Sequence, residues 1–209
     1  EPYLIETAEQ LDSIRYYSSK SFKQIKDIDI GAFLSKRTDS KKYPSWISNS
    51  KDGWIPIDFS GNYDGNYKKI TGYYSLNAQN GGGLFGRVKT EIRYLLTHKC
   101  SLSNILLYFD SKGINTGEYN IGWVGGLVNY VSDDVEIKNC LVCGDIVSKN
   151  DIGGIIGGGD AEICNCCFVG NLQGGSCVGG IASDIYGSVT NCITSGNFKG
   201  SHVGGIYSY

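Results

Sequence analysis

The feature that most constrains the fold is an internal repeat of 26 residues. An Asn-Cys pair recurs with this step at Asn139-Cys140, Asn165-Cys166 and Asn191-Cys192. In the same phase, a glycine follows each pair at Gly144, Gly170 and Gly196. Gly-Gly pairs between aliphatic residues recur with a similar spacing, beginning at Gly125, Gly153, Gly179 and Gly204. Several matches in one phase predict a single structural unit repeated along the chain.

Each unit has the alternation of short strands. Ile163, Cys166, Phe168 and Leu172 fall on one side, and the change of phase at Asn165 indicates a turn. Segments this short cannot bury a face alone, so units must stack about 4.8 Å apart, with each strand paired to its copies. We therefore predict an all-β fold, a right-handed parallel β-helix (solenoid). A propeller blade needs about 40–45 residues.

Stacking predicts two ladders of identical side chains. Asn139, Asn165 and Asn191 would form an asparagine ladder in which amide bonds to amide. Cys140, Cys166 and Cys192 would form a thiol ladder pointing inward. Because a buried free cysteine behaves as a small hydrophobic residue, we expect these three thiols to serve core packing.

The N-terminal part differs from the array. We divide the chain into a cap region, residues 1–58, and a repeat region, residues 59–209. Thr7-Ala8-Glu9-Gln10 predicts a capping box that opens a short helix through about Tyr16, covering the open end of the solenoid. Asp64-Gly65 predicts a hairpin turn between 59–63 and 67–73. A degenerate repeat copy is expected at 82–86 and 103–106, 35 residues before the next copy.

These units resemble the GLUG repeat, named for its Gly-Leu-x-Gly element. That element stands here as Gly83-Leu84-Phe85-Gly86, and the Asn-Cys elements at 137–144, 163–170 and 189–196 are also similar to the family. Later copies depart from it, as in Gly180-Ile181-Ala182-Ser183. The resemblance implies an extracellular or cell-surface bacterial protein, often adhesin-like. Some relatives carry the array beside a peptidase that cleaves immunoglobulin A.

Composition and charge limit the classes of partner that the chain is expected to bind. The net charge is −2 and no Lys/Arg-rich block stands out, which argues against nucleic acid and anionic membranes as partners. No apolar run reaches the roughly 18 residues of a membrane span. The chain starts at Glu1 and contains no Met, so we expect a removed leader or an excised segment. Because no cap follows the last unit, we expect the array to continue or the C-terminal coil to self-associate.

Paired carboxylates come closest to a chemical site. In the repeat register Asp134 stacks on Asp160 and Glu136 on Glu162. Acids on neighbouring coils would lie about 5 Å apart, a spacing that suits a calcium ion or a retaining glycosidase pair. The alternative is an exposed turn with solvated acids. We predict no catalytic residue, and no cofactor besides this possible calcium ion.

Other reactive residues form no recognised motif. His98 and His202 do not belong to a His-Glu-x-x-His zinc motif. Alternation separates Cys166 from Cys164 and Cys167, which disfavours zinc. In a secreted protein we expect a disulfide within one set of cysteines: Cys100, Cys143, Cys164, Cys167 and Cys177. Aromatic residues could form a glycan platform, with these candidates: Tyr73, Tyr74, Tyr108, Tyr119, Trp123, Tyr130 and Tyr186.

The leading functional hypothesis is a non-catalytic extracellular surface module. It would bind a host or environmental ligand, either glycan or protein, or act as a stalk. One alternative is a carbohydrate-active β-helix enzyme, which would need converging acids and bases. Arginine is scarce where such a site would lie, because the arginines all precede the regular array: Arg15, Arg37, Arg87 and Arg93. The other alternative is a structural filament subunit that assembles through its ends. Fold alone does not decide between these classes.

Overall fold

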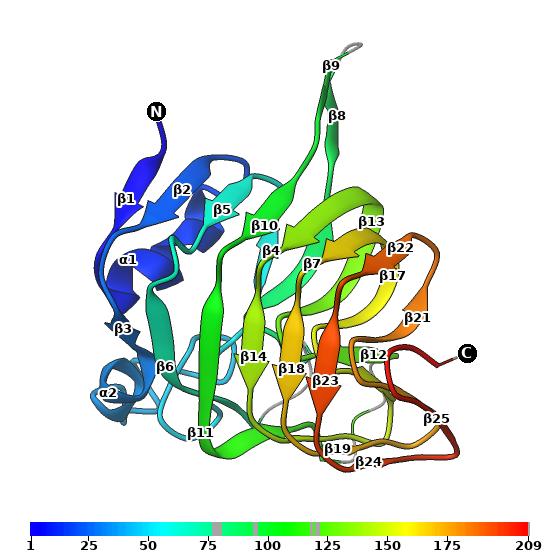
Figure 1. The fold of residues 1–209 in the computed structure, drawn as a ribbon. Helices are drawn as coiled ribbons and strands as arrows, with labels where there is room; N and C mark the ends of the chain where they lie inside the picture. The colour runs from blue at the N-terminus through cyan, green and yellow to red at the C-terminus, as the bar shows by residue number, and fades with distance from the viewer. Residues whose placement is uncertain (77–80, 94–95, 118, 120–121, 209) are drawn as a thin grey trace.

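The protein is nearly all-β, with parallel strands in curled sheets and few helices (Figure 1). The structure is a computed structural model that describes residues 1–76, 81–93, 96–117, 119 and 122–208. For residues 91–93 and 96–98 it describes the backbone alone. Among the described residues, strand pairing is parallel throughout the three large sheets. No described helix has the length and apolar character needed to cross a bilayer.

The largest sheet has ten strands and runs the length of the molecule. Its main path follows the order β1, β2, β5, β10, β13, β17, β21, while β22 pairs with β17, and β4 and β7 join at β13. The strands are β1 (Tyr3–Ile5), β2 (Ser21–Gln24), β4 (Ile57–Phe59), β5 (Asn62–Asp64), β7 (Phe85–Lys89), β10 (Ser101–Ser103), β13 (Val128–Lys138), β17 (Ile156–Cys164), β21 (Ala182–Ile185) and β22 (Ser188–Thr190).

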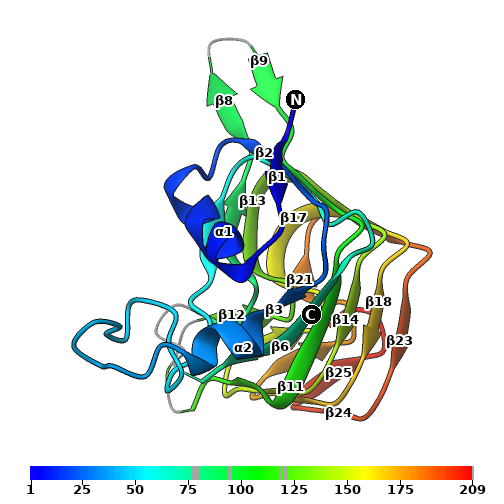
Figure 2. The ribbon, with the colours of Figure 1, turned by 90° about the vertical axis from the view of Figure 1, so that its left-hand side faces the viewer.

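Two further parallel sheets enclose the core. The nine-stranded sheet contains β3 (Ile28–Asp29), β6 (Lys69–Ser75), β11 (Leu106–Asn115), β14 (Leu141–Cys143), β15 (Ile146–Val147), β18 (Cys167–Val169), β19 (Leu172–Gln173), β23 (Ile193–Ser195) and β24 (Phe198–Lys199). The four-stranded sheet contains β12 (Trp123–Gly125), β16 (Asp151–Gly153), β20 (Cys177–Gly179) and β25 (His202–Gly204). A protruding antiparallel hairpin, β8 (Glu91–Arg93) and β9 (Leu96–His98), interrupts the pattern (Figures 1 and 2).

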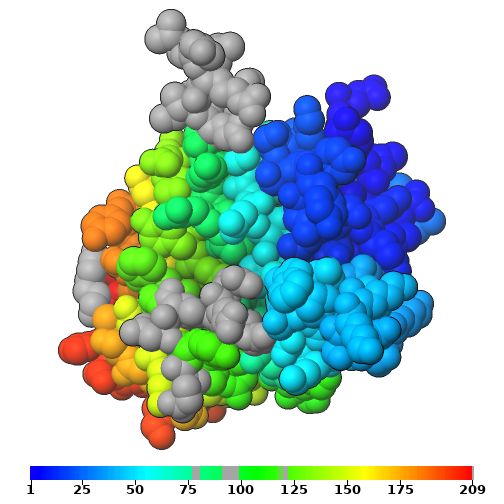
Figure 3. All heavy atoms as spheres, turned by 180° about the vertical axis from the view of Figure 1, so that it is seen from behind, coloured from blue at the N-terminus to red at the C-terminus, as the bar shows by residue number. Residues whose placement is uncertain are grey.

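The predicted register of 26 residues is confirmed. Ile137 is the Cα partner of Ile163, which is in turn the partner of Val189. Successive units therefore visit the three sheets in the same order, and each strand lies beside its copy. In the space-filling view, the colours accordingly pass in chain order from one end of the molecule to the other (Figure 3).

The core lies inside this stack. The predicted inward set of the middle unit is confirmed, since Ile163, Cys166, Phe168 and Leu172 are all buried. The same positions in the last unit are only half-buried, as at Phe198, because no later described unit covers them. Burial of such a column is the main stabilising contribution expected from stacking.

Two short helices lie at the N-terminal end (Figure 2). The predicted capping box of α1 (Ala8–Ser13) is confirmed: Gln10 N–H donates to Thr7 Oγ1 at 3.3 Å, and Gln10 Oε1 accepts from Thr7 N–H at 3.3 Å. A 3₁₀ turn, η1 (Ile14–Tyr16), continues it, and Leu11 and Ile14 are buried as expected. A second helix, α2 (Ile30–Ser35), which we did not predict, is capped by Asp29.

The predicted hairpin at Asp64-Gly65 is wrong. Strand β5 pairs with β2 and β10, whereas β6 pairs with β3 and β11, so the two strands belong to different sheets. Asn66 and Tyr67, both with positive φ, turn the chain around a corner instead of back on itself. A turn signal specifies a change of direction, but it does not specify which strand becomes the partner.

Glycine forms the second corner of each unit. Gly144, Gly170 and Gly196 occupy equivalent positions, and Gly144 and Gly196 have φ of +145° and +146°. A Cβ on Gly170 would overlap the carbonyl oxygen of Gly144, and one on Gly196 would overlap that of Gly170. Each unit therefore sits against the backbone of the one before it, an approach that only glycine permits.

Candidate functional site

The first corner of each unit carries a ladder of side-chain amides. Asn165 Nδ2 donates to Asn139 Oδ1 at 3.2 Å, and Asn139 Nδ2 donates to Asn104 Oδ1 at 3.0 Å. Asn104 Nδ2 in turn donates to Asp64 Oδ1 at 2.8 Å, so the ladder ends on a carboxylate. Asn191 has the same positive φ at the equivalent corner. The amides support the left-handed corner and join the units, which is a structural task.

A second polar ladder was missed by the sequence reasoning. Asn171 Nδ2 donates to Asp145 Oδ1 at 3.0 Å, and Asn197 Nδ2 donates to Asn171 Oδ1 at 3.1 Å. These residues directly follow Gly144, Gly170 and Gly196, so the 26-residue spacing contained the signal. The residue type changes from Asp to Asn after the first copy, which concealed it.

The inward thiols lie in one column. Cys140 and Cys166 are buried and Cys192, in the last unit, is half-buried. The Cys140 thiol, together with burial, raises the pKa of the Cys166 thiol well above its usual value. The Cys166 thiol and burial likewise raise the pKa of Cys192. Such protonated thiols are poor nucleophiles and poor metal ligands at neutral pH.

All eight cysteines are free thiols in the structure, so the disulfide expected in the outer set is not formed. Burial raises the pKa of Cys100 to about 12, and its thiol donates to the Gly61 carbonyl at 2.9 Å. Burial also raises the pKa values of Cys143 and Cys167. Cys164 and Cys167 are half-buried while Cys166 is buried, as alternation predicts.

The four acids proposed as a calcium site are distributed around a lysine. Lys99 Nζ lies 3.1 Å from Asp134 Oδ1 and 2.9 Å from Glu162 Oε2, and these two acids raise the pKa of its ammonium group. Glu136 is the Cα partner of Glu162, and its carboxylate pairs with Lys138 at 2.8 Å. Two ammonium groups, those of Lys99 and Lys138, thus already pair with three of the carboxylates.

The fourth acid, Asp160, is not a strand partner of Asp134. The pairing of β13 and β17 shifts between Val131 and Val135, where Asp133 and Asp134 adopt positive φ. Within the described part of the chain, no group of three or more His, Cys, Asp or Glu side chains is arranged to hold a metal ion. Of the two histidines, the side chain of His98 is outside the described residues and His202 is exposed in β25.

The candidate aromatic residues differ in how much of each ring reaches solvent. Tyr73 and Tyr74 are buried, so they cannot offer a ring to a ligand. Trp123 and Tyr130 are half-buried and lie together, with ring centroids 5.0 Å apart and a 32° angle between the planes. Tyr186 is highly exposed at a corner of the last unit. The sequence named Trp123 and Tyr130 among seven candidate rings, and only the fold brings the two side by side.

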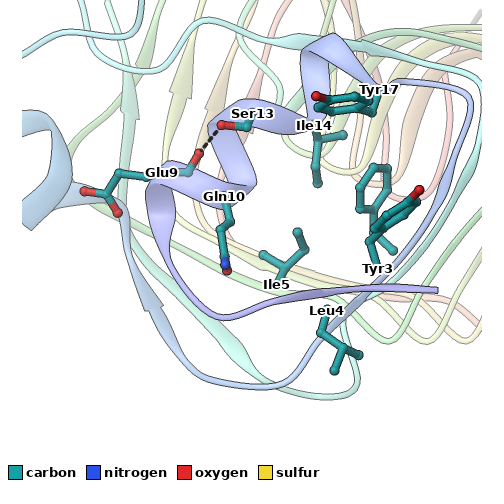
Figure 4. Close-up of a pocket in the computed structure, with 9 residues that line it drawn as sticks. Tyr3, Leu4, Ile5, Glu9, Gln10, Ser13, Ile14 and Tyr17 are labelled. Carbon is teal, nitrogen blue, oxygen red and sulfur yellow. Dashed lines mark hydrogen bonds between the residues drawn. The ribbon is translucent and has the colours of Figure 1, made fainter.

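An apolar cavity of about 520 Å³ lies between β1 and α1 (Figure 4). Tyr3 and Ile5 point from β1 toward the helix, where Ile14 and Tyr17 face them, and Leu4 points away. Strand β1 is at the end of its sheet, so one of its edges has no partner strand among the described residues. This arrangement can accept an apolar group beside a free strand edge, but it carries no nucleophile paired with a base.

Comparisons with known proteins give limited matches. No family model matches the chain. A protein of Evansella cellulosilytica, provisionally named a Gly-rich membrane protein, is 36% identical over 94 residues, which is 41% of this chain and 9% of that protein. This chain thus corresponds to a small part of that relative. A crystal structure from Bacteroides ovatus, provisionally named an immunoglobulin A1 protease, aligns with a TM-score of 0.45 and 17% identity over 96% of this chain and 78% of that one.

Proposed function

We propose that the chain is a right-handed parallel β-helix of GLUG-like units that stands on the outside of a cell as a non-catalytic, adhesin-like module. The observation that carries the proposal is the register of the units, in which Ile137, Ile163 and Val189 follow one another across β13, β17 and β22. Such a stack forms a rigid rod with a long, regular outer face, which suits presentation of a binding surface.

The use of the polar side chains supports a non-catalytic role. The asparagines of both corners bond to one another, and Lys99 lies between two of the acids. These groups therefore hold the units together instead of converging on a substrate. The name of the Evansella cellulosilytica relative, a Gly-rich membrane protein, supports a place at the cell envelope.

The proposal is tested on the natural full-length protein in the organism that makes it. Antibodies to this segment should label intact cells, and external protease should remove the label without lysis. Cells lacking the gene should adhere less to their host or environmental surface. Labelling only after permeabilisation would contradict the proposal, and unchanged adherence with external labelling would leave the stalk role as the function.

A filament subunit is the second candidate, because β1 and β22 each have one edge without a partner strand among the described residues. Strand β1 lies at one end and β22 at the other, and the last unit exposes Ile193 and Val203. A second copy could extend the parallel pairing from the C-terminal coil. Size-exclusion chromatography should then show concentration-dependent polymers that Ile193→Lys abolishes. A monodisperse monomer at every concentration would contradict this role.

A further inference from the structure

The outer face of the ten-stranded sheet carries a row of aromatic and charged groups. Arg87 is the Cα partner of Tyr130, Tyr130 of Gly158, and Gly158 of Asp184. These positions therefore follow one another across β7, β13, β17 and β21. Their strand neighbours Val88, Val131 and Ile185 are buried, so the row itself faces outward.

The glycine in this row makes room for an aromatic ring from another sheet. The indole of Trp123, in β12, lies over Gly158, where a Cβ would come within 2.9 Å of Trp123 Cδ1 and 3.0 Å of Nε1. The ring also contacts Tyr130, with a centroid distance of 5.0 Å. Without this glycine the indole would have to move away from the row. The absence of a side chain at one register position thus lets the Trp123 ring lie beside the Tyr130 ring.

Polar groups flank the two rings. The Arg87 guanidinium lies 5.5 Å from the centroid of the Tyr130 ring, and Asp184 is at the opposite end of the row. Among the described residues, neither the Arg87 guanidinium nor the Asp184 carboxylate forms a salt bridge. The Trp123 Nε1–H likewise has no hydrogen-bond partner among these residues. Donors and acceptors without partners beside half-buried rings are the usual composition of a binding site with few directed contacts.

We propose that the row Arg87, Tyr130, Trp123 and Asp184 binds a neutral oligosaccharide. The inference rests on the proposed function and names the ligand class of that module. Ring faces stack on the flat apolar face of a sugar, while Arg87, Asp184 and the indole N–H bond to hydroxyl groups. Four adjacent strands span about 14 Å, which is longer than one sugar ring, so a chain of sugars is favoured. A carboxylate in the row would repel phosphate, so nucleic acid is a poor ligand.

The test uses tryptophan fluorescence of the purified 209-residue chain. Of the three tryptophans, Trp54 is fully buried and Trp46 is an exposed loop residue, so Trp46→Phe leaves Trp123 as the accessible reporter. Hexasaccharides of β-glucan, α-mannan and β-galactan are titrated in turn. We expect one of these hexasaccharides to shift the fluorescence emission of the Trp46→Phe variant saturably. Tyr130→Ala and Trp123→Ala should each weaken the affinity for that hexasaccharide at least about tenfold, and calorimetry measures the affinity of the Trp123→Ala variant.

Two surface variants keep the test independent of folding. Arg87→Gln and Asp184→Asn change partly exposed polar groups, and each should weaken the affinity about fivefold with an unchanged urea midpoint. Tyr16→Ala, which removes a highly exposed ring outside the row, should bind as the parent does. The inference is overturned if no hexasaccharide binds, if these row variants bind normally, or if the row binds only peptides.

Failure of the inference is distinguishable from failure of the proposed function. If intact cells display the segment and depend on it for adherence while no hexasaccharide binds, the ligand class is wrong and the surface role stands. If the protein is found only inside the cell, the surface role is wrong even where the row binds sugar.

Discussion

Asn165 donates its side-chain amide to the side-chain oxygen of Asn139, 26 residues earlier, at 3.2 Å. Both residues have positive φ, 54° and 56°, at the same corner of successive units. One residue type therefore serves two purposes: it tolerates the left-handed backbone that turns the chain, and it joins its unit to the previous one. This double role explains why asparagine recurs in one phase.

Replacing Asn139 should destabilise the fold through both roles. Asn139→Ala loses two side-chain hydrogen bonds and puts a residue that tolerates left-handed backbone less well at the corner, so we expect a loss of about 3 kcal/mol in the free energy of unfolding. Asn139→Gly retains the backbone freedom and should lose about 1–2 kcal/mol less than the alanine variant. Urea denaturation followed by circular dichroism measures both. Equal losses would show that the corner does not require left-handed backbone.

The glycine column should tolerate no side chain in the middle of the stack. In Gly170→Ala the new methyl group meets the Gly144 carbonyl oxygen, so we expect a loss of several kcal/mol or failure to fold. Gly205→Ala is the matched control, because nothing lies within 4 Å of a Cβ there. Thermal unfolding of the two variants should differ clearly. Similar melting temperatures would contradict the close stacking of units at this corner.

The carboxylate at the end of the asparagine ladder should make stability depend on pH. Although partial burial acts to raise the pKa of Asp64, hydrogen bonds from Asn104 and Asn66 and the charge of Lys23 hold it below its usual value. Because the pKa of Asp64 is lower in the folded state than in the unfolded state, its carboxylate stabilises the protein at pH values above the unfolded-state pKa of about 3.9. This contribution is lost as the pH falls through the pKa of the folded state.

Asp64→Asn should therefore be less stable than the parent by about 1 kcal/mol at pH 7, because a charged acceptor is replaced by a neutral one. The difference should shrink below pH 4 as the parent carboxylate becomes protonated. Urea midpoints at pH 7, 4 and 3 measure it, with the exposed Asp133→Asn as control. A difference that stays constant down to pH 3 would mean that the ionisation of Asp64 does not contribute to the stability of the fold.

The lysine between the acids should make calcium unnecessary. Because Lys99 lies within 3.1 Å of both Asp134 and Glu162, millimolar calcium should leave the melting temperature of the parent unchanged. These pairs are exposed, so Lys99→Ala should cost less than about 1 kcal/mol. Differential scanning calorimetry with and without calcium measures this. A calcium-dependent rise in the parent would restore the metal site that the sequence suggested.

The thiols should react according to burial. Since burial raises the pKa of Cys100 to about 12, its thiol should be almost fully protonated at pH 8. We expect a maleimide to label the half-buried Cys164 and Cys177 at least about tenfold faster than Cys100 and Cys166 in the folded protein. Peptide mapping by mass spectrometry gives the order. Uniform labelling would show that the inward column is open to solvent.

The sequence predicted the repeated part of the fold better than its ends. Asn139 and Cys166 revealed the register because identical residues in stacked units face identical surroundings. The Asp145–Asn171 ladder escaped notice because its residue type changes between units. The β5–β6 corner was predicted as a hairpin, because Asp64-Gly65 signals a turn whichever strand becomes the neighbour.

The candidate site depended on packing that periodicity does not encode. Trp123 and Tyr130 were recognised as candidate rings, but their contact results from a corner that brings β12 against β13, and from the missing side chain at Gly158. Arg87 and Asp184 join them only through strand partners outside the regular motif. Likewise, the role of Lys99 between two acids follows from its position beside the β8–β9 hairpin, which has no counterpart in the repeat.

The stacking of 26-residue units is tested most directly by deleting one unit. Removing 140–165 joins Asn139 to Cys166 and keeps every later residue in phase. Urea unfolding followed by circular dichroism should show a cooperative transition of a β-rich protein for this variant, whereas deletion of 140–152, half a unit, should abolish the transition. Loss of cooperative folding in the 26-residue deletion, or its retention in the half-unit deletion, would contradict the architecture.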